Sequence, residues 1–386
     1  MFALAARLQE TVPFYAVELF KEAVGMQARG LDIISLGIGE PDFTAAPQVV
    51  AAMEQAAARG LSGYSPPAGL QALREAIAGH YETHLGAYVD PSRVIVTSGA
   101  SGALLLAALS LVNPGDEVLM PDPSYPANRN FISAAGGVSR MISTTPEARY
   151  QLCAQDIEQH WGPATRGILI ASPSNPTGTS IDHAALSDLL ASVRRRNGFV
   201  MMDEIYLGLS YDQTPQTALA LDDNLIILNS FSKYFHMTGW RLGWMIVPAS
   251  MVASVEKLAS SLAICAPTLA QHGAVACFEP DALQVFEHRR EAFRQRRDFL
   301  VPALESIGIR VPVKPDGAFY VYGDVSAHSD DSAAFSTQLL HHAHVAAVPG
   351  MDFGPAHARR SMRFAYTTGL DKLEEAVERM RRYLLA

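Results

Sequence analysis

The segment SFSKYFHMTGWR, residues 230–241, combines residue types that bind phosphate with a candidate nucleophile. Lys233 follows an apolar run and two serines, and Arg241 comes eight residues later. A lysine amine can form a Schiff base with an aldehyde, while hydroxyl and guanidinium groups bind phosphate. Most lysines in proteins are solvated, so the interpretation of Lys233 depends on which other groups the chain brings near it.

Polar or small residues also follow the preceding apolar runs. They are Gly99, Ala100 and Ser101 after the first run, Tyr125 after the second, Asn175 after the third, Asp203 and Tyr206 after the fourth, and Ser230 and Ser232 after the fifth. Ligands of open parallel sheets bind at the carboxyl ends of the strands, and a turn that opens a helix suits a phosphate. This inventory fits a phosphorylated heteroaromatic aldehyde.

The elements that would position these residues alternate along the chain between about residues 90 and 250. Helix-like stretches include 101–112, 127–135 and 182–196. The β-rich runs between them are 93–98, 116–121, 167–172, 199–204, 225–230 and 243–248. Continuous apolar strands that alternate with helices predict an α/β fold with a mainly parallel sheet covered on both faces.

The last third of the chain is less regular and predicts a smaller α+β domain. Its expected elements are helices at 281–306, 332–343 and 370–384 and strands at 317–325 and 361–366. The helix-like stretch 15–29 is expected to pack against this part, because residues 1–30 are too few to fold alone. We therefore expect a large domain at 31–284 and a small domain formed by 1–30 and 285–386.

Composition excludes several classes of partner. A formal net charge of −9 disfavours a nucleic-acid partner. The three cysteines form no CxxC pair, which suits a reducing cytoplasm. The longest apolar stretch, 103–112, is about half a membrane span and predicts a buried helix, so we expect a soluble, cytoplasmic protein without a membrane partner.

Nine short motifs, which follow one another along nearly the whole chain, resemble those of a known protein family. They are ISLGIGEPDF (34–43), GYSPPAGLQALREAI (63–77), VTSGASGAL (96–104), NPGDEVLMPDPSYP (113–126), SNPTGT (174–179), MDEIY (202–206), SFSKYFHMTGWRLGW (230–244), GAFYVY (317–322) and MRFAY (362–366). The chain resembles the class I/II aminotransferases of the fold-type I, aspartate-aminotransferase-like superfamily. The resemblance implies a seven-stranded type of sheet, pyridoxal 5′-phosphate as cofactor and a homodimer.

The resemblance also implies roles for individual residues. Lys233 forms the Schiff base and moves the proton, Asp203 pairs with the pyridinium nitrogen, and Tyr206 and Asn175 hold the phenolate oxygen. Tyr125 stacks on the ring. The phosphate is held by Gly99, Ala100, Ser101, Ser230, Ser232 and Arg241, with Tyr64 reaching it from the neighbouring subunit. The substrate carboxylate is bound by Arg363, with Gly39 and Asn175 assisting.

The alternation in SMRFAY places Arg363 and Ala365 on one side of the strand and Met362 and Phe364 on the other. An arginine on a strand is most often a surface residue, so the binding role of Arg363 rests on the resemblance. Arg359 and Arg360 are competitors, but they precede the strand.

Other functions stay open at this point. On the same frame, a carbon–sulfur β-lyase is the main alternative, although a histidine is expected after DEI in that group, where this chain has Tyr206. A non-catalytic regulator would need an attached DNA-binding domain, for which residues 1–30 leave no room.

Three further sets of residues have open or minor roles. Arg129 is a candidate to bind a substrate side-chain carboxylate, and His236 is a candidate pocket residue. The histidines 341, 342 and 344 lack suitably spaced partners, so no metal site is expected. The substrate of the reaction is not indicated by any motif.

Overall fold

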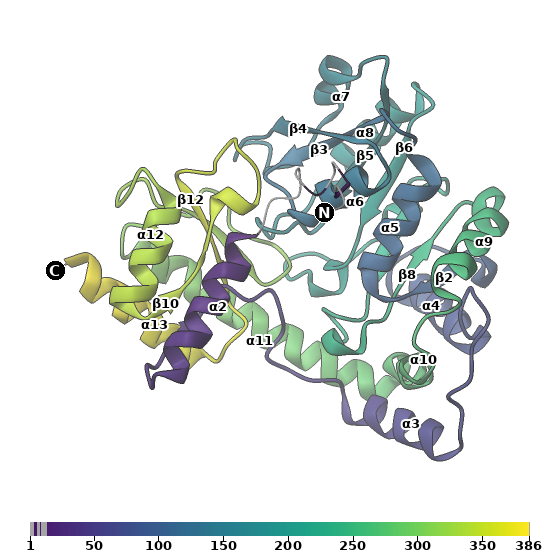
Figure 1. Cartoon of the computed structure of the whole chain (residues 1–386), viewed down its shortest axis with the longest axis horizontal. Helices are drawn as coiled ribbons and strands as arrows, with labels where there is room; N and C mark the ends of the chain where they lie inside the picture. Colours follow the sequence, from purple (N-terminus) through teal and green to yellow (C-terminus); the bar gives the residue numbers. More distant parts are fainter. Residues whose placement is uncertain (1–3, 6–7, 9–13, 386) are drawn as a thin grey trace.

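The computed structural model describes residues 4–5, 8 and 14–385 (Figure 1). Its largest sheet has seven strands in the order β2-β8-β7-β6-β5-β3-β4. The strands are β2 (Val94–Thr97), β3 (Glu117–Asp122), β4 (Val138–Ser143), β5 (Thr165–Ala171), β6 (Phe199–Asp203), β7 (Ile226–Ser230) and β8 (Gly243–Ile246). All six predicted runs form strands of this sheet, and β4 is the additional one.

Most neighbouring strands of the sheet run parallel, which confirms the predicted class. The pairs β4–β3, β3–β5, β5–β6 and β6–β7 are parallel, whereas β8 is antiparallel to both β7 and β2. Asp203 at the end of β6 is in register with Ala171 on β5 and Leu228 on β7. The carboxyl ends of these parallel strands therefore lie at one edge of the sheet.

Helices cover both faces of the sheet, because alternate residues of each strand enter different core clusters. Ile95 and Met201 belong to the cluster that contains residues of α5 and α9. Val96 and Met202 belong to the cluster that contains residues of α4 and α8. The helices of this part are α3 (Pro47–Ala58), α4 (Gln71–His84), α5 (Gly99–Leu111), α6 (Ala127–Ala134), α7 (Ala154–His160), α8 (His183–Arg194), α9 (Val252–Ala263) and α10 (Thr268–Val275).

A second, smaller set of elements comes from the two ends of the chain (Figure 1). Strands β11 (Val348–Pro349), β12 (Ser361–Ala365) and β9 (Tyr320–Asp324) form an antiparallel sheet, and β1 (Ile34–Ser35) pairs with β10 (Val345–Ala346). The helices are α2 (Tyr15–Ala28), α11 (Pro280–Glu305), α12 (Ser332–Gln338) and α13 (Leu370–Leu385).

Helix α2 packs against the C-terminal elements, as the sequence predicts. Leu19, Ala23 and Met26 on its buried face form a cluster with Leu340 and Ala346. The division into domains at 30/31 and 284/285 stays a prediction.

The helix predicted at 332–343 is shorter than expected, whereas the buried helix predicted at 103–112 is confirmed. The helix predicted at 332–343 ends at Gln338, and a π-helical turn, Leu339–Ala343, follows it. Helix α5 is largely buried, as expected of its apolar sequence. Within residues 4–5, 8 and 14–385, no helix is long and apolar enough to cross a membrane.

Candidate active site

A cavity of about 520 Å³ opens at the carboxyl ends of the central strands. Most residues that the sequence analysis assigned to a site line it: Gly39, Ala100, Ser101, Tyr125, Asn175, Asp203, Tyr206, Ser230, Ser232, Lys233, Arg241 and Arg363. These residues come from the ends of several strands, the first turn of α5, and β12. Segments far apart in the sequence thus meet at one site, as expected for ligands at the edge of a parallel sheet.

Lys233 lies beyond the end of β7, and its amine points into the cavity. The Nζ atom donates a 2.6 Å hydrogen bond to the carbonyl oxygen of Gly39. It also lies 5.8 Å from the centre of the Tyr206 ring and 5.7 Å from that of Phe319. Burial and the nearby Arg363 guanidinium lower the pKa of Lys233 to about 8. The amine therefore loses its proton closer to neutral pH than a solvated lysine does.

Asp203 is a buried carboxylate at the end of β6. Its side chain is 5% exposed, and Oδ1 accepts a 2.9 Å hydrogen bond from the backbone N–H of Ile205. Burial raises the pKa of Asp203 to about 7, against the opposing effects of this hydrogen bond and of Lys233. A carboxylate held in this environment without a full counter-charge is suited to pair with a cationic group of a ligand.

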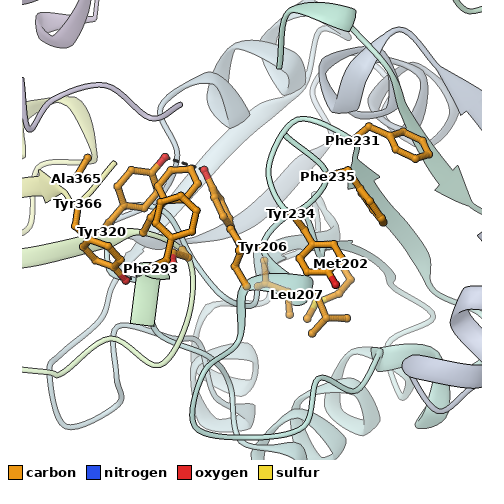
Figure 2. Packing of buried hydrophobic residues seen from close by; sticks show 14 of the residues in the cluster. Met202, Tyr206, Leu207, Phe231, Tyr234, Phe235, Phe293, Tyr320, Ala365 and Tyr366 are labelled. Atoms are coloured by element: carbon orange, nitrogen blue, oxygen red, sulfur yellow. Dashed lines mark hydrogen bonds between the residues drawn. The ribbon is translucent and has the colours of Figure 1, made fainter. Parts of the chain in front are cut away.

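Two tyrosines and an arginine form the side of the cavity nearest β12. The hydroxyl groups of Tyr206 and Tyr320 share a 2.8 Å hydrogen bond (Figure 2). The guanidinium carbon of Arg363 lies 4.4 Å from the centre of the Tyr320 ring. Burial raises the pKa of both tyrosines, so their hydroxyl groups stay protonated and act as neutral donors.

Arg363 is fixed by its hydrogen bonds but retains donor capacity. Nη1 donates to Oδ1 of Asn175 at 2.9 Å, and Nη2 donates to the carbonyl oxygen of Gly37 at 2.7 Å. The buried Nε has no hydrogen-bond partner among the described residues. The side chain faces the cavity, whereas Met362 and Phe364 are fully buried in the core, which matches the predicted alternation.

The opposite end of the cavity has the features of an anion site. The backbone of Gly99 has φ +72°, and a Cβ atom placed there would lie 2.6 Å from Nη2 of Arg241. Arg241 is itself left-handed, with φ 55°, and Nη1 donates to the carbonyl oxygen of Thr238 at 2.9 Å. The guanidinium thus lies against the first turn of α5, whose N–H groups face an anion favourably.

Some predicted residues lie outside the cavity. Gly99 contacts Arg241 but is not among the lining residues, and Tyr64 is 82% exposed. Arg129 donates from Nη2 to the carbonyl oxygen of Asp352 at 2.9 Å instead of lining the cavity. His236 is buried beside Phe43 and Phe293, and neither ring nitrogen has a partner among the described residues.

The C-terminal histidines have ordinary contacts. His341 pairs with Glu22 at 2.8 Å, and His342 stacks on Tyr383. In the part of the chain that the structure describes, no group of three histidine, cysteine or acidic side chains is placed to hold a metal ion.

Part of the cavity lining was not predicted from the sequence. Tyr320 lies within the GAFYVY motif, but the motif alone did not indicate that its hydroxyl group meets Tyr206. Val17 and Phe20 of α2, and Phe14 directly before the helix, also line the cavity. Val17, Phe20 and Val24 form an apolar row at helical spacing on an exposed face, and this row was the available signal.

Comparison with known proteins agrees with this geometry. The family described as aminotransferase class I and II matches residues 31–380. A valine–pyruvate aminotransferase of Mycobacterium tuberculosis is 38% identical, with 96% of each chain covered. A solved aminotransferase structure from the same organism has a TM-score of 0.96 at 37% identity and covers all of both chains. An aspartate aminotransferase of Thermus thermophilus, solved with maleate, has a TM-score of 0.93 at 32% identity, with 99% of this chain and 100% of that chain covered.

Proposed function

The chain belongs to the class I and II aminotransferases, and on this premise we propose that it holds pyridoxal 5′-phosphate in the cavity and attaches it to Lys233. The chain is an aminotransferase, which moves an amino group between an amino acid and a 2-oxo acid. The observation that carries the proposal is the meeting of Lys233, Asp203, Arg241 and Arg363 in one cavity.

The donor set fits this cofactor. The space beside Gly99 that a Cβ atom would fill lies against Arg241, and the first turn of α5 adds backbone donors for a phosphate. Asp203 provides the buried carboxylate that a protonated ring nitrogen requires. Tyr125 lines the cavity and offers a ring for stacking, and Asn175 and Tyr206 offer neutral donors for the phenolate oxygen.

When bound, the cofactor supplies an aldehyde that condenses with amines and a ring that withdraws electrons. The protein's part is to hold charges and to move a proton. Asp203 would keep the ring nitrogen protonated, since its negative charge is otherwise poorly compensated. Lys233 would transfer the proton at the reacting carbon, because a pKa of about 8 lets its amine both accept and release a proton near neutral pH.

Arg363 would bind the α-carboxylate of the substrate, assisted by Asn175 and the backbone of Gly39. Its guanidinium group is held by two hydrogen bonds and by its contact with the Tyr320 ring, so little conformational entropy remains to be lost on binding. A planar guanidinium group binds a carboxylate through parallel hydrogen bonds, which a lysine cannot do.

A homodimer is part of the proposal. Tyr64 is 82% exposed and lies outside the cavity of its own chain, which suits a contribution to the phosphate site of a second copy. We also propose the division into domains at 31–284 and at 1–30 with 285–386. A cytoplasmic location is consistent with the three unpaired cysteines.

Transfer of an intact amino group distinguishes this function from its alternatives. The chain matches the aminotransferase family, and relatives that are similar over nearly its full length are named aminotransferases. Both findings support amino-group transfer rather than a carbon–sulfur lyase reaction or a regulatory role. They leave the substrate open, since one relative is named for valine and pyruvate and another for aspartate.

The test uses ¹⁵N-labelled amino acids, 2-oxo acids and the cofactor-loaded protein. We expect the ¹⁵N in the new amino acid, as measured by mass spectrometry. Release of ¹⁵N as ammonia together with a thiol from a cysteine-type substrate would instead identify a lyase. No turnover of any donor would contradict the proposed function.

A further inference from the structure

The 37–43 segment, which lies between β1 and α3, lines one side of the cavity with residues 37–40. Three successive carbonyl oxygens of this segment accept hydrogen bonds from side chains. The bonds run from Arg363 Nη2 to Gly37 at 2.7 Å, from Thr367 Oγ1 to Ile38 at 3.1 Å and from Lys233 Nζ to Gly39 at 2.6 Å. The position of the segment therefore helps to set where the amine of Lys233 and the guanidinium group of Arg363 lie.

The two ends of the segment are held in different ways. Leu36, directly before it, donates to the carbonyl oxygen of Ala346 at 2.7 Å and accepts from the N–H of Ala365 at 2.6 Å. A Cβ atom at Gly39 would lie 2.6 Å from the hydroxyl oxygen of Tyr320, so the middle of the segment packs tightly against the site. The residues at its C-terminal end belong to no strand or helix, so contacts of their side chains must hold them.

Arg296 of α11 holds this C-terminal end. Its Nη1 and Nη2 atoms donate to the two carboxylate oxygens of Asp42 at 2.7 and 2.8 Å. Its guanidinium carbon lies 5.1 Å from the centre of the Phe43 ring and 5.1 Å from that of the Phe293 ring. The side chain of Arg296 is buried, so this bidentate pair is largely shielded from solvent and is stronger than a pair on the surface.

Phe43 extends this contact to the turn that carries the nucleophile. The rings of Phe43 and His236 pack edge to face, with their centres 5.4 Å apart. The backbone N–H of His236 donates to the carbonyl oxygen of Lys233 at 3.3 Å. Arg296 thus supports both partners of the hydrogen bond between Lys233 and Gly39.

We propose that Arg296 is a positioning residue of the transfer reaction, which acts through its ion pair with Asp42 to hold the 37–43 segment in place. This inference rests on the proposed function for the transfer itself. Arg296 does not line the cavity, so its effect reaches the reacting groups through the segment. A displacement of about 1 Å at a reacting group can cost on the order of 100-fold in rate, and we expect a smaller loss here because Leu36 still anchors the segment.

The next residue of α11 offers a matched control. Arg297 donates from Nη1 and Nη2 to the two oxygens of Asp212 at 2.6 and 2.9 Å, and it is buried as well. Neither Arg297 nor Asp212 lines the cavity. Asp42→Asn and Asp212→Asn each remove one negative charge from a bidentate pair with a buried arginine and keep the shape of the side chain. The two variants differ in which segment loses its anchor.

Turnover is measured with the best donor of the ¹⁵N assay. Asp42→Asn should lower kcat/KM by about tenfold, because a charge-assisted contact that holds the segment is lost. Asp212→Asn should leave kcat/KM within about twofold. Asp42→Glu, which keeps the carboxylate, should restore kcat/KM to within about threefold of the wild-type value. Urea unfolding checks that each variant is folded under the assay conditions.

Binding distinguishes positioning from a general loosening of the fold. The ligand is the acid analogue of the same donor, with hydrogen in place of the amino group. Its Kd, measured by calorimetry, should rise about threefold to tenfold in Asp42→Asn, because the carbonyl of Gly37 no longer orients Arg363. Pyridoxamine 5′-phosphate forms no Schiff base with Lys233, and its phosphate lies at the opposite end of the cavity. Its Kd should stay within about twofold in both variants.

The outcomes separate the two proposals. If no donor transfers its ¹⁵N, the proposed function fails. If transfer occurs but Asp42→Asn and Asp212→Asn lose kcat/KM alike, or if the Kd of pyridoxamine 5′-phosphate rises as much as kcat/KM falls, the positioning role is wrong while the proposed function stands. If Asp42→Asn does not fold, Arg296→Lys tests the same contact against Arg297→Lys, and an equal loss in these two variants would overturn the inference.

Discussion

Replacing Asp203 by asparagine should stabilise the cofactor-free protein while slowing amino-group transfer. The carboxylate is 5% exposed, and burial raises its pKa from 3.8 to about 7. Each pKa unit corresponds to about 1.4 kcal/mol, so ionised Asp203 would cost up to about 4 kcal/mol of folding free energy at pH 8. Asparagine keeps the shape of the side chain and can still accept the hydrogen bond from Ile205.

The sign of the pH dependence follows from the same shift. Between about pH 4 and pH 7, folded Asp203 retains a proton that the unfolded chain has released, so its contribution to stability falls as the pH rises through this window. The asparagine variant lacks this dependence. We therefore expect the gain in unfolding free energy to be small at pH 4 and to reach about 1–4 kcal/mol at pH 8, as measured by urea unfolding.

Activity provides the second half of the test. With cofactor bound, Asp203→Asn should lower kcat/KM by on the order of 100-fold or more, because an amide cannot hold the ring nitrogen protonated. Glu204→Gln is the matched control, since Glu204 is also buried but bonds to Thr217 and Ala218 and does not line the cavity. A variant of Asp203 with near-normal activity, or one destabilised at pH 8, would show that this carboxylate is structural.

Three further outcomes follow from the site. Arg363→Lys should lower kcat/KM by on the order of tenfold to a few hundredfold for every amino acid but not for an amine without a carboxylate; an equal loss for the amine would exclude a carboxylate-binding role. Gly99→Ala should weaken cofactor binding about tenfold in Kd, because φ is +72° and the new Cβ atom would displace Arg241; unchanged affinity would place the phosphate elsewhere. The rate of cofactor attachment to Lys233 should rise with pH to a plateau above about pH 8, since the neutral amine reacts; a rise continuing to pH 10 would contradict the lowered pKa.

The central strands could be predicted because their residues are apolar on both faces. Met201 and Met202 enter the core clusters on opposite faces of the sheet. A strand buried on both faces has a continuous apolar sequence, and this is the pattern from which the strands were predicted. Strand β4 was missed because only Ile142 on it is fully buried, so its sequence carries no apolar run. The reversed direction of β8 was not predicted either, although no α-helix separates β7 from β8, and a parallel crossover usually requires one.

Some residues of the site could be predicted from the sequence, and others could not. Lys233, Asp203 and Arg363 lie on strands or directly beyond their ends, so a sheet with the right order brings them together. Asp352 and the start of α2 could not be predicted to meet, because their contact joins residues more than three hundred positions apart and depends on how α2 packs against β10 and β11. The hydrogen bonds of Asp352 with α2 become visible only in the folded chain.

Borohydride reduction of the cofactor-loaded protein, followed by peptide mass spectrometry, tests the central claim most directly. Reduction makes the bond between lysine and cofactor permanent. We expect the cofactor mass on the peptide that contains Lys233 and no such label in the Lys233→Ala variant, which should still bind the cofactor noncovalently through Arg241 and the first turn of α5. A label on Lys257 or Lys314, or none at all in the wild-type protein, would contradict the account.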